Sequence, residues 1–211
     1  MKISWESAEN LAESFDVSRE SLGRLQIYVE RLQSWQRRIN LIGRSTEDDI
    51  WLRHIADALQ LLPLFEQPPR RIVDLGSGAG IPGLVLAIAR PLEAHLVESN
   101  LKKAAFLREA ARVAKAKGIV HPNRIEAAGH LAQEIKPDVI TARALAPLPK
   151  LLDYAAPFLD RGAAGFFHKG QDVGAELTEA TKSWRLTFIE HPSMIDSRGC
   201  ILEIKEAHRV A

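Results

Sequence analysis

The chain has 211 residues, of which 46% are apolar and 26% charged, with a formal net charge of +1 and one cysteine. This length predicts one substantial domain plus an extension, rather than two full domains. The near-zero net charge excludes a protein that is basic overall, so any nucleic-acid surface must come from local segregation of cations. The single thiol, Cys200, excludes an internal disulfide and a zinc–thiolate site, and it fits a reducing cytosol.

Two further features bear on location. Residues 1–6 lack the long apolar segment of a signal peptide. The most apolar stretch, residues 83–89, is far too short to span a bilayer. We therefore expect a cytoplasmic protein that makes no contact with a membrane.

Apolar residues before Pro68 recur at helical spacing. A weak helix is predicted over residues 6–15. Two longer stripes follow, which consist of Leu22, Leu25, Val29 and Leu32 and of Leu52, Ile55, Leu59 and Leu62. Because the pattern changes at Pro68-Pro69, we predict a helical cap over residues 1–68 and a Rossmann-like unit over residues 69–211.

Short apolar runs alternate with helical segments after the proline pair. The runs predicted as strands are 71–75, 94–98, 124–127, 138–141 and 163–168, and the predicted helices are 82–89, 101–117 and 148–159. Such alternation indicates parallel βαβ units in a doubly wound sheet.

The end of the chain differs, because residues 184–188 and 200–204 each alternate apolar and polar side chains around a turn-rich stretch. With no room for a crossover helix, these two strands are expected to pair antiparallel. The predicted fold is α/β, a Rossmann-like, seven-stranded, mostly parallel sheet with a C-terminal antiparallel hairpin and an N-terminal helical extension. This arrangement resembles the class I S-adenosylmethionine-dependent methyltransferase fold.

The turn after the first predicted strand carries the strongest chemical signal. Gly76, Gly78 and Gly80 allow a tight bend and the close approach of a ligand. A dinucleotide-binding enzyme would place its third glycine where this chain has Ile81. The carboxylate of Asp74 would repel a pyrophosphate but attract a sulfonium cation and an ammonium group. The turn therefore favours a methyltransferase over a dehydrogenase.

A glycine-rich turn alone is weak evidence, because many strand-to-helix turns contain glycine. Glu98 strengthens the interpretation, since it ends the second predicted strand, where a carboxylate can accept hydrogen bonds from both ribose hydroxyls. Together, Asp74, the glycine turn and Glu98 predict an S-adenosylmethionine site.

Several longer motifs make the resemblance closer than fold class. They are Val73-Asp74-Leu75-Gly76-Ser77-Gly78-Ala79-Gly80-Ile81-Pro82-Gly83, Leu96-Val97-Glu98-Ser99, Arg53-His54-Ile55-Ala56-Asp57, Thr141-Ala142-Arg143-Ala144 and His168-Lys169-Gly170. Taken in chain order and over nearly the whole chain, they resemble the RsmG family, also called GidB. Members of that family use S-adenosylmethionine to methylate N7 of a guanine in the 530 loop of 16S ribosomal RNA.

The resemblance implies roles for particular residues. Cofactor contacts are implied at Gly76, Gly78, Ile81, Ile125, Glu126 and Arg143, with Ile125-Glu126 expected to end the third strand. Arg143 and Lys169, both expected at the edge where ligands of open α/β sheets collect, are candidates for positioning the substrate. Ala56, Ala58 and Ala128-Gly129 depart from the family pattern, so the fine shape of the pocket is left open.

The chemistry of guanine N7 agrees with the absence of an obvious acid–base pair. This nitrogen has a free lone pair and carries no proton, so catalysis can depend on holding the reacting atoms in line. Attack on pyrimidine C5 would need a cysteine nucleophile, and Cys200 is predicted to be a core residue away from the ligand edge. No metal site is predicted, and the pair His54 and Asp57 is interpreted as structural.

Basic residues are candidates for the RNA surface. Those singled out are Lys102, Lys103, Arg53, His54 and Lys169. The expected partner is 16S ribosomal RNA, free or within the small subunit or its assembly intermediate, and the protein is expected to act as a monomer. Trp35 and Trp51 are interpreted as packing residues rather than as platforms for base stacking.

Three other interpretations stay open. A methyltransferase for another RNA, a protein or a small molecule would have the same cradle, but if its substrate were not RNA its activity would be indifferent to salt. A non-catalytic module of this fold would bind no cofactor or bind it without turnover. A nicotinamide oxidoreductase is disfavoured by Asp74 and Ile81.

Overall fold

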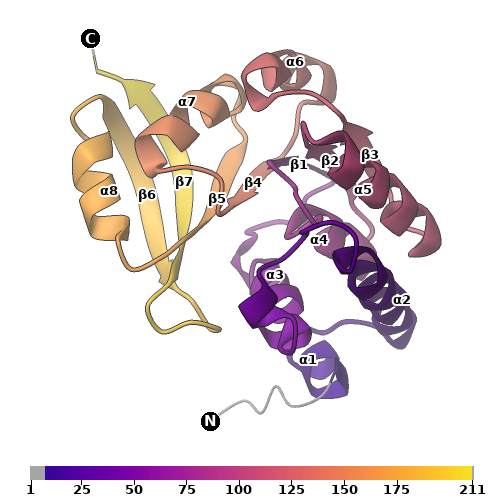
Figure 1. Ribbon diagram of the computed structural model, residues 1–211. Helices are drawn as coiled ribbons and strands as arrows, with labels where there is room; N and C mark the ends of the chain where they lie inside the picture. The colour runs from indigo at the N-terminus through magenta and orange to yellow at the C-terminus, as the bar shows by residue number, and fades with distance from the viewer. Residues whose placement is uncertain (1–7, 211) are drawn as a thin grey trace.

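The computed structural model describes residues 8–210 and confirms an α/β architecture around one sheet. Its seven strands lie in the order β3-β2-β1-β4-β5-β7-β6 (Figure 1). The five parallel strands are β1 (Arg71–Leu75), β2 (Glu93–Val97), β3 (Gly118–His121), β4 (Val139–Arg143) and β5 (Ala164–Lys169). The hairpin of β6 (Trp184–Pro192) and β7 (Cys200–Arg209) adds the antiparallel pairs, as predicted.

Helices cover both faces of the sheet (Figure 1). One face carries α2 (Arg19–Gln36), α4 (Gly83–Ala89) and α5 (Leu101–Val113). The other carries η4 (Ile125–His130), α6 (Leu131–Ile135), α7 (Leu148–Leu159) and, packed on α7, α8 (Val173–Ala180). Two hydrophobic clusters follow from this layering, one on each face.

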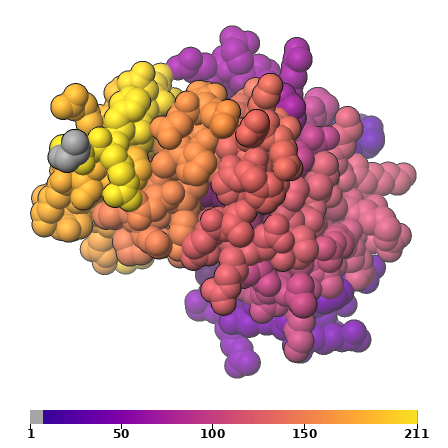
Figure 2. Space-filling model, turned by 90° about the horizontal axis from the view of Figure 1, so that it is seen from above, coloured from indigo at the N-terminus to yellow at the C-terminus, as the bar shows by residue number. Residues whose placement is uncertain are grey.

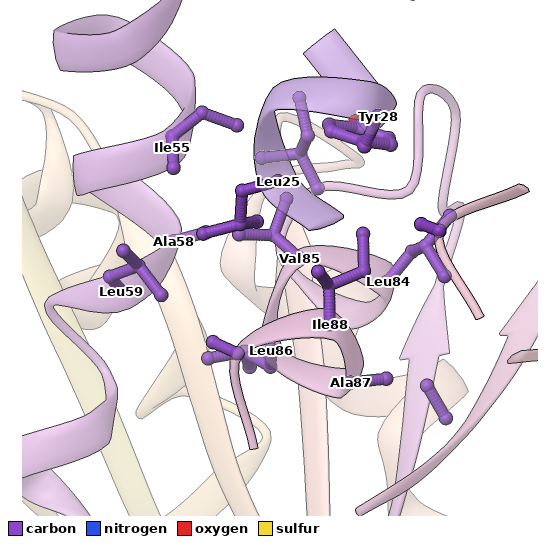
Figure 3. Close-up of a cluster of buried hydrophobic side chains, with 14 of the residues drawn as sticks. Leu25, Tyr28, Ile55, Ala58, Leu59, Leu84, Val85, Leu86, Ala87 and Ile88 are labelled. Atoms are coloured by element: carbon purple, nitrogen blue, oxygen red, sulfur yellow. The ribbon is translucent and has the colours of Figure 1, made fainter. Parts of the chain in front are cut away.

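The N-terminal cap consists of the helix α2 and several shorter helices stacked on the α4 face. Besides α2 these are α1 (Ala8–Ser14), the 3-10 turn η1 (Arg44–Thr46), the π-helix η2 (Trp51–Ala56), α3 (Asp57–Leu59) and the 3-10 turn η3 (Leu62–Leu64). Leu25, Ile55 and Leu59 of the cap interdigitate with Val85 and Ile88 of α4 (Figure 3). Because these side chains belong to one buried cluster, the cap shares its core with the sheet. Burial of each such side chain contributes about 1.5–3 kcal/mol to the free energy of unfolding.

Trp35 and Trp51 are packing residues, as predicted. The ring of Trp35 meets the edge of Phe106 on α5 at a centroid distance of 5.8 Å, and Trp51 packs against the buried cluster. Tyr28 of α2 reaches further, and its hydroxyl donates to the carbonyl of Ala79 in the glycine turn at 2.7 Å. The cap therefore supports the turn directly.

Several predicted boundaries were wrong. The third strand is Gly118–His121, and residues 125–130 form a 3-10 helix instead of a strand. β3 pairs only with β2 and lies at the sheet edge, so its side chains are half-buried or exposed and its apolar pattern is weak. The helix predicted over 101–117 ends at Val113, and α8 was not predicted. Residues 6 and 7 of the predicted first helix lie outside the described residues.

Described residues of the C-terminal third gather at one end of the molecule in the space-filling view (Figure 2). Within residues 8–210, no helix has the length and apolar content that a membrane crossing requires.

Candidate active site at the carboxyl edge of the sheet

The turn after β1 forms an open cradle. Gly76, Gly78 and Gly80 have φ angles of +69°, +54° and +85°, a region that other residues avoid. A Cβ built on Gly78 would meet nothing closer than the Gly76 carbonyl oxygen at 3.8 Å. A Cβ on Gly80 would lie 2.8 Å from Leu84 Cβ. Gly78 therefore borders free space, whereas Gly80 allows α4 to pack closely.

Glu98 fixes the cradle from the neighbouring strand. The backbone N–H of Gly78 donates to Glu98 Oε2 at 2.9 Å, and that of Asn100 donates to Oε1 at 2.7 Å. The predicted proximity of the glycine turn and Glu98 is thus confirmed. Each carboxylate oxygen keeps a lone pair, so two further hydrogen bonds, such as those of a ribose diol, can be accepted.

Asp74 lies beneath the turn and is fully buried. Its Oδ1 accepts a hydrogen bond from the Thr141 hydroxyl at 2.7 Å, while its Oδ2 has no partner. Burial raises the pKa of Asp74 to about 6, although hydrogen bonds from Thr141 and its neighbours oppose that rise. The turn lies between this carboxylate and a ligand in the cradle. Asp74 can therefore act on the ligand only across the turn, and not by direct contact at the cradle surface.

An apolar wall stands over Gly76. A Cβ built on Gly76 would lie 2.7 Å from Leu145 Cδ1 and 3.6 Å from Ile125 Cδ1. Ile125 therefore borders the cradle, although it begins η4 rather than ending a strand. The exposed Glu126 accepts a hydrogen bond from the Tyr154 hydroxyl at 3.1 Å. Ile81 is buried in the core beneath the turn.

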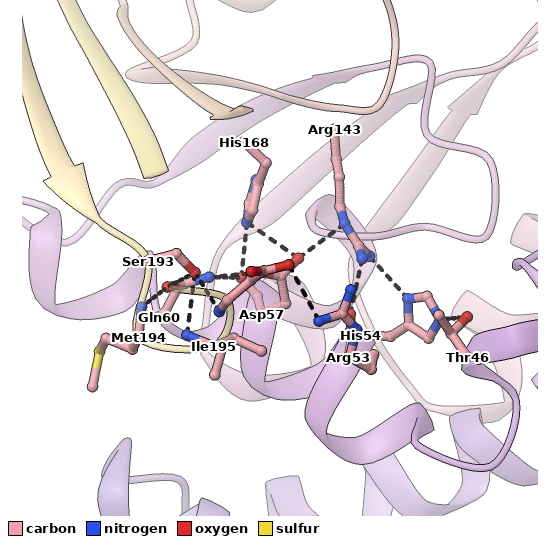
Figure 4. Close-up of polar contacts among 11 residues, drawn as sticks. Thr46, Arg53, His54, Asp57, Gln60, Arg143, His168, Ser193, Met194 and Ile195 are labelled. Atoms are coloured by element: carbon pink, nitrogen blue, oxygen red, sulfur yellow. Dashed lines mark hydrogen bonds and ion pairs between the residues drawn. The ribbon is translucent and has the colours of Figure 1, made fainter. Parts of the chain in front are cut away.

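Arg143, the last residue of β4, joins the cap to the sheet (Figure 4). Its Nε forms a 2.9 Å ion pair with Asp57 Oδ2, and its two terminal nitrogens donate to His54 Nδ1 at 2.9 Å and to the Arg53 carbonyl at 2.8 Å. The guanidinium is thus committed to η2 and α3. The position of Arg143 at this edge was predicted from the sequence, but its partners were not.

The contacts of His54 define its protonation state. Because Arg143 donates to Nδ1, the proton must be on Nε2, which then donates to the Thr46 hydroxyl at 2.8 Å. Burial, and then the charges of Arg143 and Arg53, lower the pKa of His54 to about 4. The ring is therefore neutral at physiological pH.

The same network extends to the loop between β6 and β7 (Figure 4). Asp57 Oδ1 accepts from Gln60 Nε2 at 2.7 Å, and Gln60 Oε1 accepts from the Met194 N–H at 2.9 Å. The Asp57 carbonyl accepts from His168 Nε2 at 2.8 Å. Three distant segments thus meet at Asp57. Gln60 carried no signal in the sequence, because only the tertiary fold brings it to this loop.

The predicted basic residues separate into two groups. Lys102 is exposed and Lys103 half-buried at the N-terminus of α5, and the side chain of Arg53 is 39% exposed. By contrast, His54 is buried, and the buried Lys169 ammonium contacts Glu176 and the Ala146 carbonyl. Only the first group offers cations to a partner in this conformation.

A cavity of about 410 Å³ lies beside Arg143. Residues of η2 and α3, the ends of β4 and β5, the β6–β7 loop and the start of β7 line it. Cys200 is among them, because β7 runs antiparallel and its first residue pairs with Lys169 at the end of β5. The expectation that Cys200 lies away from the ligand edge was wrong. Burial raises the pKa of its thiol to about 11, so it remains protonated.

The geometry of this edge agrees with what comparison with known proteins shows. The family described as GidB, rRNA small subunit methyltransferase G, matches residues 21–201. The chain belongs to this family.

Relatives of this GidB-family chain are similar over almost their whole length. A ribosomal RNA small subunit methyltransferase G of Rhodospirillum rubrum is 50% identical, over 95% of this chain and 98% of the relative. That of Paramagnetospirillum magneticum is 47% identical, over 95% and 96%.

Solved structures with low sequence identity share the fold. A putative O-methyltransferase from Klebsiella pneumoniae has a TM-score of 0.55 at 12% identity, covering 85% of this chain and 90% of that one. A mutant of MtNAS in complex with S-adenosylmethionine has a TM-score of 0.56 at 14% identity, covering 94% and 77%. The class I methyltransferase fold predicted for the GidB-family chain is thus confirmed.

Proposed function

We propose that this chain transfers a methyl group from S-adenosylmethionine to N7 of a guanine in the 530 loop of 16S ribosomal RNA. The chain is a member of the rRNA small subunit methyltransferase G family, and the open cradle held against Glu98 is the observation that carries the proposal. The position of the methyl group and the identity of the loop come from the family resemblance.

The cradle residues fit S-adenosylmethionine. The space beside Gly78 leaves room for a ligand, Glu98 has acceptors for a ribose, and Ile125 and Leu145 offer apolar surface for an adenine. The unpartnered oxygen of Asp74 places negative potential beneath a cationic ligand. When bound, this cofactor supplies a methyl group activated by a positively charged sulfur.

The acceptor requires positioning rather than proton transfer. Guanine N7 carries no proton, so a site without a general base suffices if the two reactants are aligned. Arg143 and Lys169 are positioning residues in this proposal, because their donors hold the cap and the segment around Ala146 and Glu176 in place. Removing either side chain would loosen a wall of the cavity.

We infer that Lys102, Lys103 and Arg53 contact RNA phosphates, while His54 and Lys169 support the site from within. Lys102 and Lys103 lie at the start of α5, whose N-cap Asn100 also donates its N–H to Glu98. The partner is 16S ribosomal RNA, free or within the small subunit or its assembly intermediate. We propose that the protein acts on this RNA as a monomer.

Mapping of the methylated nucleotide tests the proposal. Ribosomal RNA from cells that lack this activity would be incubated with the protein and labelled S-adenosylmethionine, then digested to nucleosides. We expect 7-methylguanosine at one position of the 530 loop. Label on an adenine, on a ribose or on protein would contradict the assignment, and cofactor binding without turnover would indicate a non-catalytic module.

A further inference from the structure

The cavity beside Arg143 has the size and position of an acceptor site. Its volume of about 410 Å³ lies within the range of about 300–1,000 Å³ that small-ligand pockets occupy. Ala144 and Arg143 line it, and Leu145, the next residue, contacts the cradle at Gly76. A single nucleotide turned out of an RNA loop can enter such a space, whereas a base-paired stem cannot.

An enzyme that methylates N7 must distinguish guanine from adenine by some other atom, because both bases have this nitrogen. The difference lies on the Watson–Crick edge, where guanine presents N1–H and an amino group and adenine presents an unprotonated N1. Enzymes that act on flipped bases read this edge with hydrogen bonds. A carboxylate is the side chain that accepts two such bonds from guanine and repels the adenine N1.

Two carboxylates line the cavity, and one of them is already committed. Asp57 uses Oδ1 for Gln60 and Oδ2 for Arg143, at 2.7 and 2.9 Å. Glu176, in the adjoining hollow, holds Lys169 and the Leu148 N–H. Asp196, in the β6–β7 loop, is the other carboxylate of the described cavity wall.

Asp196 is held in place but keeps acceptor capacity. Its Oδ1 accepts from the Arg198 N–H at 3.0 Å and lies 3.6 Å from Arg198 Nε. Its Oδ2 is contacted only at 3.5 Å, by Arg53. The hydrogen bond from the Arg198 N–H, together with the charges of Arg198 and Arg53, lowers the pKa of Asp196, so the carboxylate is ionised at neutral pH. Its side chain is 32% exposed and accessible to a ligand.

We infer that this cavity receives the target guanine and that Asp196 determines specificity by accepting the guanine N1–H and amino hydrogens. The inference rests on the proposed function. Arg53 and Arg198 flank the carboxylate, and their cations are available to the phosphates on either side of the flipped nucleotide. Binding of the base would replace the long contact between Asp196 and Arg53.

Inosine provides the test, because it keeps N7, O6 and N1–H and lacks only the amino group. Full-length 16S ribosomal RNA would be assembled by ligation with guanosine or inosine at the target position, and kcat/KM measured for each. We expect the wild-type protein to methylate the inosine RNA roughly tenfold less efficiently, within the range for loss of a specific base contact.

Asp196→Asn should abolish this preference. Its amide oxygen still accepts from the Arg198 N–H, so the turn is kept, but its amide nitrogen is a donor that faces the guanine donors. We expect kcat/KM on guanosine RNA to fall about tenfold and the guanosine-to-inosine ratio to approach one. Cofactor affinity by calorimetry and Tm should stay near the wild-type values.

Two control variants separate base reading from other roles. Arg53→Gln removes the cation nearest Asp196 Oδ2. It should lower kcat/KM by the same factor for both RNAs and keep the wild-type guanosine-to-inosine ratio. Asp160→Asn alters an exposed carboxylate at the end of α7 and should leave kcat/KM unchanged for both RNAs.

A wild-type protein that treats both RNAs alike would overturn the inference, as would an Asp196→Asn variant that keeps the wild-type ratio. Failure of the wild type to methylate even the guanosine RNA would instead overturn the proposed function, and the inference with it.

Discussion

Single residues set the properties of the cradle, and Gly78 is the one whose missing side chain leaves open space. Gly162 makes a comparison, because its φ is +88° and a Cβ there would meet nothing within 4 Å, while a Cβ on Gly78 would meet the Gly76 carbonyl oxygen at 3.8 Å. Gly162, however, lies in the turn before β5, at the opposite edge of the sheet. A side chain at either position carries a similar backbone cost, of about 1–2 kcal/mol. The difference that bears on ligand binding is that Gly78 borders the proposed ligand and Gly162 does not.

Gly78→Val should therefore raise the Kd for S-adenosylmethionine by at least about tenfold, or about 1.4 kcal/mol, because the side chain fills the ligand space. Gly162→Val should lose similar stability and keep wild-type affinity. Isothermal titration calorimetry and thermal melts would measure both effects. Unchanged affinity in Gly78→Val would mean that the cradle is misplaced.

Asp74 should make stability depend on pH in an unusual direction. Its folded-state pKa of about 6 is above its ordinary value of 3.8, so the folded state binds the proton more tightly than the unfolded state does. Stability from this group is therefore present at low pH and is lost as pH rises from about 4 to about 6. A shift of about two pKa units corresponds to about 3 kcal/mol at neutral pH.

Asp74→Asn should consequently raise the free energy of unfolding at pH 7 by up to about 3 kcal/mol and give little gain at pH 4. Urea denaturation at the two pH values would measure this difference, with Asp160→Asn as an exposed control. An equal effect of Asp74→Asn at both pH values would contradict the raised pKa.

Elements are coupled at this edge by side chains rather than by the sheet alone. The cap, β4 and the β6–β7 loop have no common strand ladder, yet Asp57 binds Arg143, and Gln60 carries the contact to Met194 (Figure 4). The cap thus forms part of the cavity wall. The π-helix η2 presents Arg53 to the cavity, while its buried His54 contacts Arg143.

Asp57→Asn should loosen this connection at a cost of about 2 kcal/mol, because Arg143 loses its anionic partner. Hydrogen exchange should speed up in residues 51–62 and 193–196 and stay unchanged in α7. Asp48→Asn, at an exposed position of the same cap, is the matched control. Equal protection from hydrogen exchange in the wild type, Asp57→Asn and Asp48→Asn would show that the ion pair does not hold the cap.

The whole molecule is nearly neutral, with a net charge of +1, so RNA binding must depend on where its cations lie. Lys102 and Lys103 stand at the cofactor edge, and Arg53 and Arg198 stand at the cavity. Binding to phosphates through these residues releases counterions, which makes the affinity fall steeply as salt rises.

RNA affinity should therefore decline linearly on a plot of log K against log salt, and the double variant Lys102→Gln, Lys103→Gln should reduce the slope by about one per lysine. Filter binding at several salt concentrations would measure the slopes. Lys182→Gln, at the exposed end of α8, should leave the slope unchanged. A salt-independent affinity of the wild type would favour a substrate other than RNA.

The layered fold and the cradle could be predicted from the amino-acid sequence, because both depend on local signals. Helical and alternating spacing of apolar residues placed most elements, and the glycines at 76, 78 and 80 with Glu98 marked the ligand turn. The position of the edge strand β3 was predicted wrongly, since a strand with one neighbour buries few side chains and shows little alternation of apolar and polar residues.

Which side chains meet at the site could not be predicted, because their contacts depend on the complete fold. The pairing of Arg143 with Asp57, the burial of Lys169 against Glu176 and the place of Cys200 in the cavity all join residues far apart in the chain. No local propensity encodes such contacts, because they arise where β4 and β5 end, β7 begins and the cap packs against them at one edge of the sheet.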